Sequence, residues 1–502
     1  MGLLVCGGHV VTDPRRAEAV VEDGAVYVEG TDIVEVGPAA TLRSRHPGAE
    51  EIGSRQHLVI PGLVNGHHHG SGVTATQLGR VDDALEIWKL GAWGSRRVDP
   101  YLNTLYACVR QIASGVTTTL HFNGTEQPEQ FEAEALDRLR AYNEAGLRVA
   151  FALEARDRHT FVYGDDEAFL RTLPAPLEQQ LRSLGLHRYQ KPEAYLASVE
   201  RLHRQFATHP RIRIFLAPYA PQWCTDELLQ AMVALARRLG TGMQLHCLET
   251  PYQQAFGPRV YGEPVIAHLH RLGLLGPGVS LAHGVWLTPG DLPVLRESGA
   301  AIIHNPSSNL RLKSGLAPVL GLLEAGVTVG LGTDGVGLND DDDLLQDLRL
   351  CLNLHREPGL TGRVLSPHQA LALATVHSAR ALGVEHGLLA PGRAADLVLL
   401  DLDAVRGVGP EGAVDPVTLL VARGTRAHVS TVVIGGRVVL REGRCLTVDT
   451  AALEERIREQ LRRPLPPRGR ERRAVVEALD PHVRKFFETW GPLPRWPTAL
   501  EG

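Results

Sequence analysis

The sequence has few cysteines, no long hydrophobic run and no recognisable export signal, and each absence excludes a class of protein. Its six cysteines are scattered and form no CxxC pair, so a disulfide scaffold is not expected. No stretch reaches the roughly 18 apolar residues that a membrane-spanning helix needs. The first residues lack the basic start and apolar core of a signal peptide. We therefore expect a cytoplasmic protein with reduced thiols and no membrane partner.

The sequence also lacks the basic excess that is typical of nucleic-acid binders. It has 52 basic and 57 acidic residues and a net charge of −5, which argues against a nucleic-acid partner. The most basic stretch, from Arg456 to Arg473, contains Glu459 and Glu471 and has no aromatic residue on which a base could stack. This stretch is interpreted as a solvated helix or a subunit contact, and a homodimer or larger homo-oligomer is expected.

The pattern of apolar residues predicts two kinds of structure along the chain. Residues 1–60 and 390–448 contain short strand-like segments, and the Gly-Gly pair at 435–436 is typical of a hairpin turn. Residues 61–389 alternate apolar strands with helical stretches. We predict an α/β fold: a (β/α)₈ TIM-like barrel with a small β-sandwich domain built from both chain ends. Residues 449–502 are predicted to be a C-terminal helical extension.

Residues that can bind a metal ion occur where predicted barrel strands end. His67 and His69 are two apart in the first strand, so both point to the same side. His246, His283 and Asp334 end the fifth, sixth and eighth strands. A single such residue would be an ordinary surface or turn residue, but strand ends of a barrel meet at one face. Three of these imidazoles together with the carboxylate suit Zn²⁺ or Fe²⁺ with one position left for water.

This order of ligands resembles the amidohydrolase superfamily. Three motifs, at residues 61–69 (PGLVNGHHH), 246–249 (HCLE) and 304–310 (HNPSSNL), are most similar to its cytosine-deaminase/chlorohydrolase-like group, which includes guanine deaminase and methylthioadenosine/S-adenosylhomocysteine deaminase. The resemblance covers residues 1–445. It implies a hydrolase of C–N bonds other than peptide bonds, which removes an exocyclic amino group from a purine, pterin, pyrimidine or triazine-like heterocycle and releases ammonia.

The resemblance also implies a role for each residue. The expected metal ligands are His67, His69, His246 and Asp334. Relatives with two metals bridge them with a carboxylated lysine on the fourth strand, and residues 211–218 contain none. One divalent transition metal is therefore expected, with Zn²⁺ favoured and Fe²⁺ as the alternative. Asp334 would carry a proton from water to the leaving ammonia, and His283 would hydrogen-bond to the attacking oxygen.

Glu249 is the residue that points to deamination. A carboxylic acid near the metal can protonate the ring nitrogen beside the C–NH₂ carbon. Its other interpretation is an exposed glutamate in the first turn of a helix. Some triazine chlorohydrolases keep the same glutamate, so cleavage of a C–Cl, C–S or cyclic amide bond by the same fold remains an alternative. A more remote alternative is an inactive protein that binds a metal and serves as a scaffold.

Several loop residues are candidates for contact with a small heterocyclic substrate. They are Arg156, Arg158, Trp223, Trp286, Ser308 and Asn309. The arginines could clamp a carboxylate or a ring edge, or pair with neighbouring acids. Trp286 could stack on a flat ring or lie in the core. The Arg158–Pro192 insertion is predicted to close over the barrel mouth as a lid, whereas Asp340–Asp343 could repel an anionic substrate or cap a helix.

Overall fold

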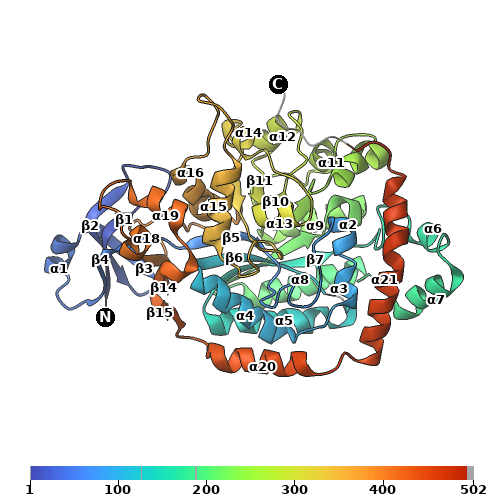
Figure 1. Ribbon diagram of the computed structural model, residues 1–502, viewed down its shortest axis with the longest axis horizontal. Coiled ribbons are helices and arrows are strands. Elements are labelled where there is room, and N and C mark those ends of the chain that lie inside the picture. Colours follow the sequence, from blue (N-terminus) through green and yellow to red (C-terminus); the bar gives the residue numbers. More distant parts are fainter. Residues whose placement is uncertain (1, 126, 187–188, 494–502) are drawn as a thin grey trace.

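The protein, for which we describe a computed structural model over residues 2–125, 127–186 and 189–493, contains two eight-stranded sheets (Figure 1). One sheet is entirely parallel, with its strands in chain order. Its strands are β5 (Leu63–His68), β6 (Val116–Asn123), β7 (Arg148–Ala155), β8 (Ile212–Pro218), β9 (Met243–Cys247), β10 (Val279–His283), β11 (Ala301–His304) and β12 (Val329–Leu331). This sheet with its helices is the predicted TIM-like barrel.

The barrel closes between its first and last strands at the mouth. Asp334, three residues after β12, donates its backbone N–H to the carbonyl oxygen of His67 at 2.9 Å. A parallel bridge joins His68 to Asp334. The chain segments that close the barrel therefore also carry two of the residues expected to bind a metal.

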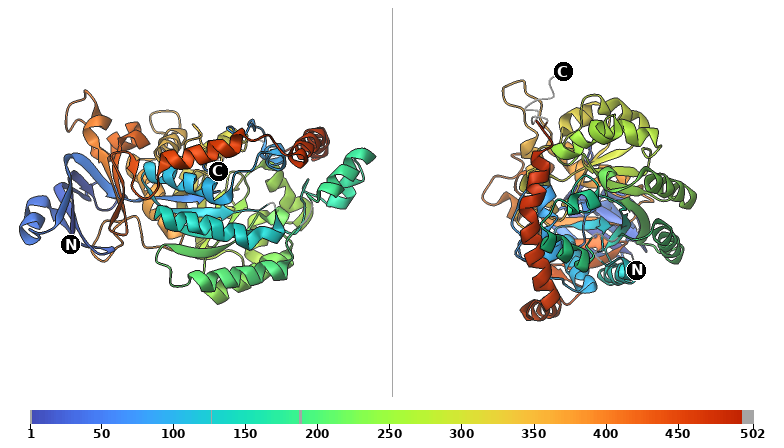
Figure 2. Two further views of the ribbon diagram at one scale, coloured as in Figure 1. Left: turned by 90° about the horizontal axis from the view of Figure 1, so that it is seen from below. Right: turned by 90° about the vertical axis from the view of Figure 1, so that its right-hand side faces the viewer.

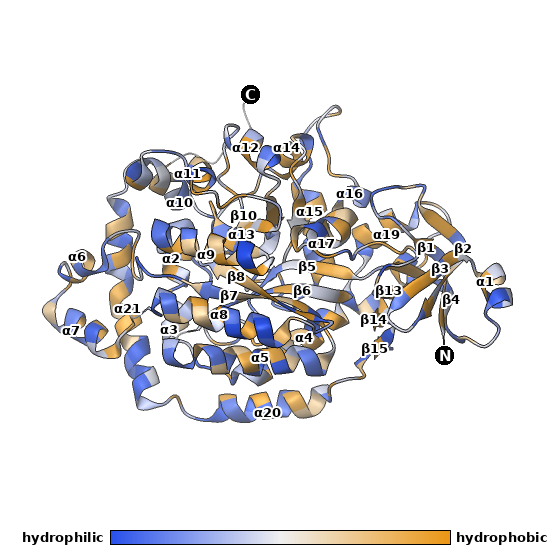
Figure 3. Cartoon of the chain, turned by 180° about the vertical axis from the view of Figure 1, so that it is seen from behind, coloured by the Kyte–Doolittle hydropathy of each residue, from blue (hydrophilic) through white to orange (hydrophobic). Residues whose placement is uncertain are grey.

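Amphipathic helices cover the outside of the barrel (Figure 3). The longer ones are α4 (Pro100–Ala113), α5 (Phe131–Ala145), α8 (Pro192–Phe206), α9 (Asp226–Leu239), α11 (Val265–Arg271), α12 (Asp291–Ser298) and α15 (Leu344–Leu354). In α9, the Thr225 side chain accepts from the Leu228 N–H and Gly240 ends the helix with φ 62°, as in ordinary N- and C-caps. None of the described helices is both long and apolar enough to cross a membrane.

Strands from both chain ends form the second sheet. Its strands are β1 (Leu3–Val11), β2 (Val20–Glu29), β3 (Asp32–Pro38), β4 (Glu50–Pro61), β13 (Leu397–Asp401), β14 (Val429–Ile434), β15 (Arg437–Arg441) and β16 (Arg444–Cys445). β13 pairs with β4, so the late strands join the early ones. Gly435 and Gly436 have φ of 55° and 74°, as a two-residue hairpin turn requires. The prediction of a small β domain built from both chain ends is confirmed.

Two C-terminal helices follow, α20 (Thr450–Arg462) and α21 (Pro467–Glu488). α20 runs beside α4, and α21 runs beside α3 (Gly91–Gly94) and α7 (Ala175–Leu184) (Figure 2). One apolar face of α21 joins aromatic residues of the predicted lid and of the barrel mouth in a separate hydrophobic cluster. The cluster includes Val475, Leu479, Val483, Phe487, Phe161, Tyr163, Phe169, Trp93 and Trp223. The insertion and the C-terminal extension thus pack together over the mouth; residues 187–188 and 494–502 lie outside the described residues.

Candidate active site and metal centre

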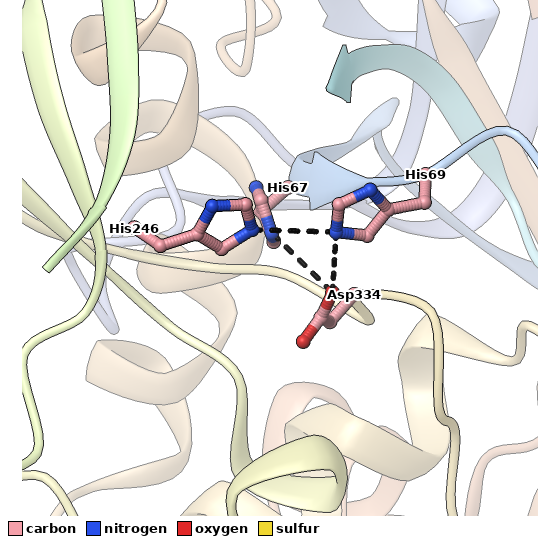
Figure 4. A group of neighbouring side chains, drawn as sticks. All are labelled: His67, His69, His246 and Asp334. Carbon is pink, nitrogen blue, oxygen red and sulfur yellow. Dashed lines mark hydrogen bonds and ion pairs between the residues drawn. The ribbon is translucent and has the colours of Figure 1, made fainter. Parts of the chain in front are cut away.

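The expected metal ligands meet at the barrel mouth (Figure 4). One donor atom each from His67, His69, His246 and Asp334 lies within 4.8 Å of the others. Asp334 Oδ1 is 3.3 Å from His67 Nε2 and 3.0 Å from His69 Nε2, and the Nε2 atoms of His69 and His246 are 3.4 Å apart. Four donors at these separations can surround one ion.

Hydrogen bonds at the far side of each ring fix which nitrogen faces this centre. In each histidine, Nδ1–H donates to an oxygen: to Gln244 Oε1 for His67 (2.6 Å), and to the carbonyls of Phe122 for His69 (3.2 Å) and Tyr219 for His246 (2.7 Å). The Nε2 lone pairs are therefore free to bind a cation, as in histidine–metal sites. His67 Nε2 is buried and has no hydrogen-bond partner among the described residues, which is costly unless a ligand takes it up. The residues present fit a divalent transition metal.

Gln244 supports this centre and was missed by the sequence analysis. It is fully buried, and its Nε2 donates to Gly66 O and Ser280 Oγ, both at 2.9 Å, which directs Oε1 at His67. Its position two residues before His246 in one strand, which places both on the same side, was the available signal.

The Gln244→Leu variant is expected to bind metal about 10–100-fold more weakly, because the outer partner of a ligating histidine usually contributes that much. Competition with a chromophoric chelator measures the affinity. Gln230→Leu, at an exposed position of α9, is the matched control. Unchanged metal affinity in the Gln244 variant would contradict this role.

Three residues at the mouth have positive φ although none is glycine. The angles are 51° for Leu248, 79° for His283 and 56° for Asp334. Such conformations cost about 1–3 kcal/mol each and occur where the surrounding structure enforces them, often at functional sites. Two of the three are candidate catalytic residues, so the backbone strain is concentrated where these side chains turn towards the centre.

Glu249 and His283 lie next to the ligand cluster. His283 Nε2 is 3.6 Å from Glu249 Oε2 and 3.8 Å from Asp334 Oδ2. Glu249 is 2% exposed, and burial, with the nearby charges of Asp334 and Glu86, raises the pKa of its carboxyl well above the usual range. Burial lowers the pKa of His283 to about 4. Burial therefore favours the neutral form of both groups, a carboxylic acid and an imidazole.

Ser308 and Asn309, two of the expected substrate contacts, hold these catalytic candidates. Ser308 Oγ donates to Asp334 Oδ2 at 2.6 Å, and His283 Nδ1–H donates to Asn309 Oδ1 at 2.8 Å. Both residues are fully buried. The second bond leaves the unpartnered Nε2 of His283 as an acceptor towards the centre.

The middle histidine of the triple run faces away from the ligand cluster. His68 Nε2 is 3.3 Å from Asp342 Oδ1, and Arg110 pairs with the same carboxylate at 3.2 Å. Asp343 caps α15 through its side chain. Of the two interpretations of the aspartate run, helix capping applies to Asp343, whereas Asp342 makes ion pairs that neither interpretation included.

Comparison with known proteins agrees with this geometry. The model of the Amidohydrolase family matches residues 58–439. The chain belongs to the amidohydrolase family. The imidazolonepropionase-like composite domain of bacteria also matches residues 24–49, inside the small domain. The family predicted from the three sequence motifs is therefore confirmed.

Several known proteins are similar to this amidohydrolase over most of its length. The 5'-deoxyadenosine deaminase of Methanosarcina mazei is 30% identical over 89% of this chain and 94% of its own. The 5-methylthioadenosine/S-adenosylhomocysteine deaminase of Syntrophobacter fumaroxidans is 32% identical over 91% and 97%. Among solved structures, a zinc-bound adenosine deaminase from Xanthomonas campestris (27% identity, TM-score 0.77, 91% and 97% covered) and a zinc complex of atrazine chlorohydrolase from Arthrobacter aurescens (25%, 0.75, 91% and 100%) are similar.

The remaining candidate substrate contacts of this amidohydrolase occupy different surroundings. The Arg156 guanidinium lies 3.9 Å from Glu154 and over the ring of Tyr219, 5.5 Å from its centroid. Arg158 donates to Pro221 O and to the hydroxyl of Tyr261, both at 3.2 Å, and so braces two loops. Trp286 lies in the main hydrophobic core, and its indole N–H donates to Ser314 O at 2.8 Å. Ser314 in turn donates to Glu249. Trp286 therefore holds the residue that hydrogen-bonds to Glu249.

Buried polar groups that the sequence analysis did not find lie beneath the lid. Glu154 is a largely buried carboxyl near His69, and desolvation raises its pKa to about 7. Glu86 Oε1 accepts from Thr250 Oγ1 at 2.6 Å and from the Tyr163 hydroxyl at 2.9 Å. Three further buried atoms have no hydrogen-bond partner among the described residues: Glu86 Oε2, Lys89 Nζ and Trp223 Nε1. Their burial depends on the lid and α21, which no local motif reveals.

Proposed function

We propose that this amidohydrolase is a mononuclear, zinc-dependent aminohydrolase that removes the exocyclic amino group of a 6-aminopurine nucleoside or a similar heterocycle. The observation that supports it most is the buried Glu249, which lies 3.6 Å from His283 and next to the four-donor cluster. The deaminases named above act on adenosine derivatives. β8 contains no lysine that could bridge a second ion, which supports a single ion at this centre.

The proposed ligands of the ion are His67, His69, His246 and Asp334. A zinc ion held by them would acidify a water molecule near neutral pH. Asp334 accepts the proton of the attacking water, and its hydrogen bond from Ser308 keeps the accepting carboxylate in place. His283, neutral and with Nε2 free, hydrogen-bonds to the attacking oxygen.

Glu249 supplies the proton that makes the ring carbon electrophilic. Its neutral carboxyl donates to the ring nitrogen beside the C–NH₂ carbon, so that attack does not have to place negative charge on the ring. The carboxylate left behind takes the remaining proton of the attacking oxygen, which restores its acid form, and Asp334 passes the proton that it took from water to the departing amino group. The product is the oxo heterocycle, and ammonia leaves.

The unpartnered groups beneath the lid are proposed to face the part of the substrate beyond the reacting ring. Glu86 Oε2 would accept from a hydroxyl, and Lys89 and Trp223 would donate. Lys89 lies 4.4 Å above the Trp223 ring, and burial lowers its pKa to about 7. Each buried polar atom that stays unpaired costs about 1–3 kcal/mol, so a polar substituent such as a sugar is favoured over a bare apolar ring.

A substrate panel read by ammonia release tests the proposal. Adenosine and its 5'-modified analogues are expected to react best, with free purines, pterins, pyrimidines and aminotriazines in parallel. The similarity to atrazine chlorohydrolase favours one second candidate, cleavage of a C–Cl bond. Chlorotriazine turnover with chloride release, and no ammonia from any amino heterocycle, would replace the deaminase proposal with that one.

We extend the proposal to a cytoplasmic homo-oligomer without a nucleic-acid partner. All six cysteines are free and five are buried, which is compatible with a reducing compartment. Light scattering on the purified full-length chain measures the assembly, and a monomer at micromolar concentration would contradict this part.

The Arg156→Ala variant is expected to raise KM and to lower kcat/KM roughly 10–100-fold, the value of a hydrogen bond to a charged group. Metal content should not change, because Arg156 contacts none of the four ligands among the described interactions. Arg158→Ala should have the same direction of effect by loosening the two loops that it braces. Arg204→Ala, exposed on α8, is the control. If both single variants match wild type on the true substrate, the lid does not orient substrate through these arginines.

A further inference from the structure

A second group of metal-binding side chains lies away from the proposed catalytic centre. It consists of His304 at the end of β11 and of Cys351 and His355 on and next to α15. One donor atom of each lies within 4.8 Å of the others. The three residues are 0%, 0% and 5% exposed, so they form a cluster inside the protein.

The spacing in the sequence and the distance in space both suit coordination. Cys351 and His355 are four residues apart, so both face the same side of α15, where His304 meets them. The Nε2 atoms of His304 and His355 are 3.2 Å apart. Two imidazole nitrogens at the usual metal–nitrogen distance of about 2.0–2.1 Å are separated by roughly 3.3–3.6 Å in a tetrahedral or trigonal site. The cluster is close to that geometry without rearrangement.

The protonation states also suit a cation. Burial lowers the pKa of His304 well below its usual range and that of His355 to about 4, so both rings are neutral near neutral pH and keep a lone pair. No described carboxylate forms an ion pair with either ring. Burial raises the pKa of the Cys351 thiol well above its usual range, but a bound cation deprotonates a coordinating thiol outright. Metal binding would therefore release one proton.

We propose that His304, Cys351 and His355 form a second metal site for a thiophilic d¹⁰ cation, Zn²⁺ or Cu⁺. A thiolate with two imidazoles selects these ions over hard cations such as Mg²⁺. Three protein donors satisfy a trigonal Cu⁺, whereas Zn²⁺ would take a further ligand such as water. The site raises the metal content expected for the whole chain from one to two equivalents.

The site would anchor the segment that positions the catalytic groups. Residues 305–309 follow β11 directly and include Ser308 and Asn309, which hold Asp334 and His283. The segment is also tied to α15 by Ser307, whose Oγ donates to Asp347 at 2.6 Å. A metal at His304 would fasten the start of the same segment to the same helix. Its role is structural, and catalysis itself does not pass through it.

The competing explanation needs no metal. His304 Nε2–H can donate directly to His355 Nε2 at the observed distance, and Asn309 Nδ2 lies 3.5 Å from His304 Nδ1 as a donor to it. Cys351 would then be a small buried apolar residue, as free cysteines often are. The two explanations differ in metal content and in whether a thiolate is bound.

Cobalt substitution separates them. The full-length chain, stripped and reloaded with Co²⁺, should show a thiolate-to-cobalt charge-transfer band in the near ultraviolet, because the barrel-mouth cluster contains no cysteine. Cys351→Ala should lose the band and one of two metal equivalents. Cys445→Ala removes the partly exposed cysteine, and this variant should keep the charge-transfer band and both metal equivalents. His355→Gln serves as a second variant if Cys351→Ala does not fold.

The outcomes also separate this site from the proposed function. A His67→Ala/His69→Ala double variant should lose activity and one equivalent but keep the cobalt–thiolate band. One equivalent in wild type with no band, unchanged in Cys351→Ala, would overturn the second site and leave the deaminase proposal intact. Competition with a Cu⁺ chelator under anaerobic conditions and with a Zn²⁺ chelator identifies which of the two ions is retained.

Discussion

The Glu249→Gln variant is expected to keep its full metal content and to lose about 10²–10⁴-fold of its deaminase kcat, the range that general acid–base catalysis contributes. The amide preserves the size of the side chain and can still meet Ser314, which donates to Glu249 Oε1 at 3.4 Å. It cannot deliver a proton to a ring nitrogen. Because Glu249 is not one of the four clustered donors, the metal should remain.

Steady-state kinetics together with metal analysis of the same preparation measure this result. Glu227→Gln is the matched control, since that glutamate is exposed on α9. Near-full turnover by the Glu249 variant would mean that the proton reaches the ring by another path. Loss of the metal would instead assign Glu249 to holding the centre.

The fold was predictable because its signals are local and repeated. Each barrel strand is a short apolar segment. The strand ends expected at His246 and His283 lie within one residue of the observed ones, whereas Asp334 lies three residues beyond the end of β12. The hairpin turn between β14 and β15 could also be predicted, because a two-residue turn with positive φ strongly prefers glycine.

The packing of the predicted lid against the C-terminal extension could not be derived in the same way. The insertion after β7 carries the expected aromatic residues, but nothing local indicates that α21, some three hundred residues later, packs against them. The acidic and basic side chains of α20 suggested a solvated surface, and Arg458 does pair with Glu454 one turn away. The apolar face of α21 is broken by Pro481 and several arginines, which hides its pattern in the sequence.

The cluster of candidate ligands was predictable from the sequence, but the polar groups around it were not. His67 and His69 alternate with His68 as a strand requires, and the structure places them on opposite sides accordingly. Glu86 and Lys89 have ordinary local sequences, and their importance comes from burial by residues far along the chain. Residue type and strand position thus predict which groups meet at the barrel mouth, whereas long-range packing decides which other polar groups lie beside them.

The Asp334→Asn variant is expected to lose about 10²–10⁴-fold or more in kcat/KM and to bind metal more weakly. Asp334 combines two roles: Oδ1 lies within 3.3 Å of both His67 and His69 Nε2, and Oδ2 accepts from Ser308. An amide carries no negative charge to offset the cation and does not accept a proton from water near neutral pH.

Added zinc separates the two roles of Asp334. If the variant is refilled to one equivalent at the barrel mouth and stays inactive, the lost function is proton transfer. If refilling restores activity, Asp334 only holds the ion and another group takes the proton from water. Ser308→Ala provides the graded comparison, because it removes one hydrogen bond to the carboxylate but leaves its charge. It should therefore keep its metal and lose less activity than Asp334→Asn, and an equal loss would show that the orientation of the carboxylate matters as much as its charge.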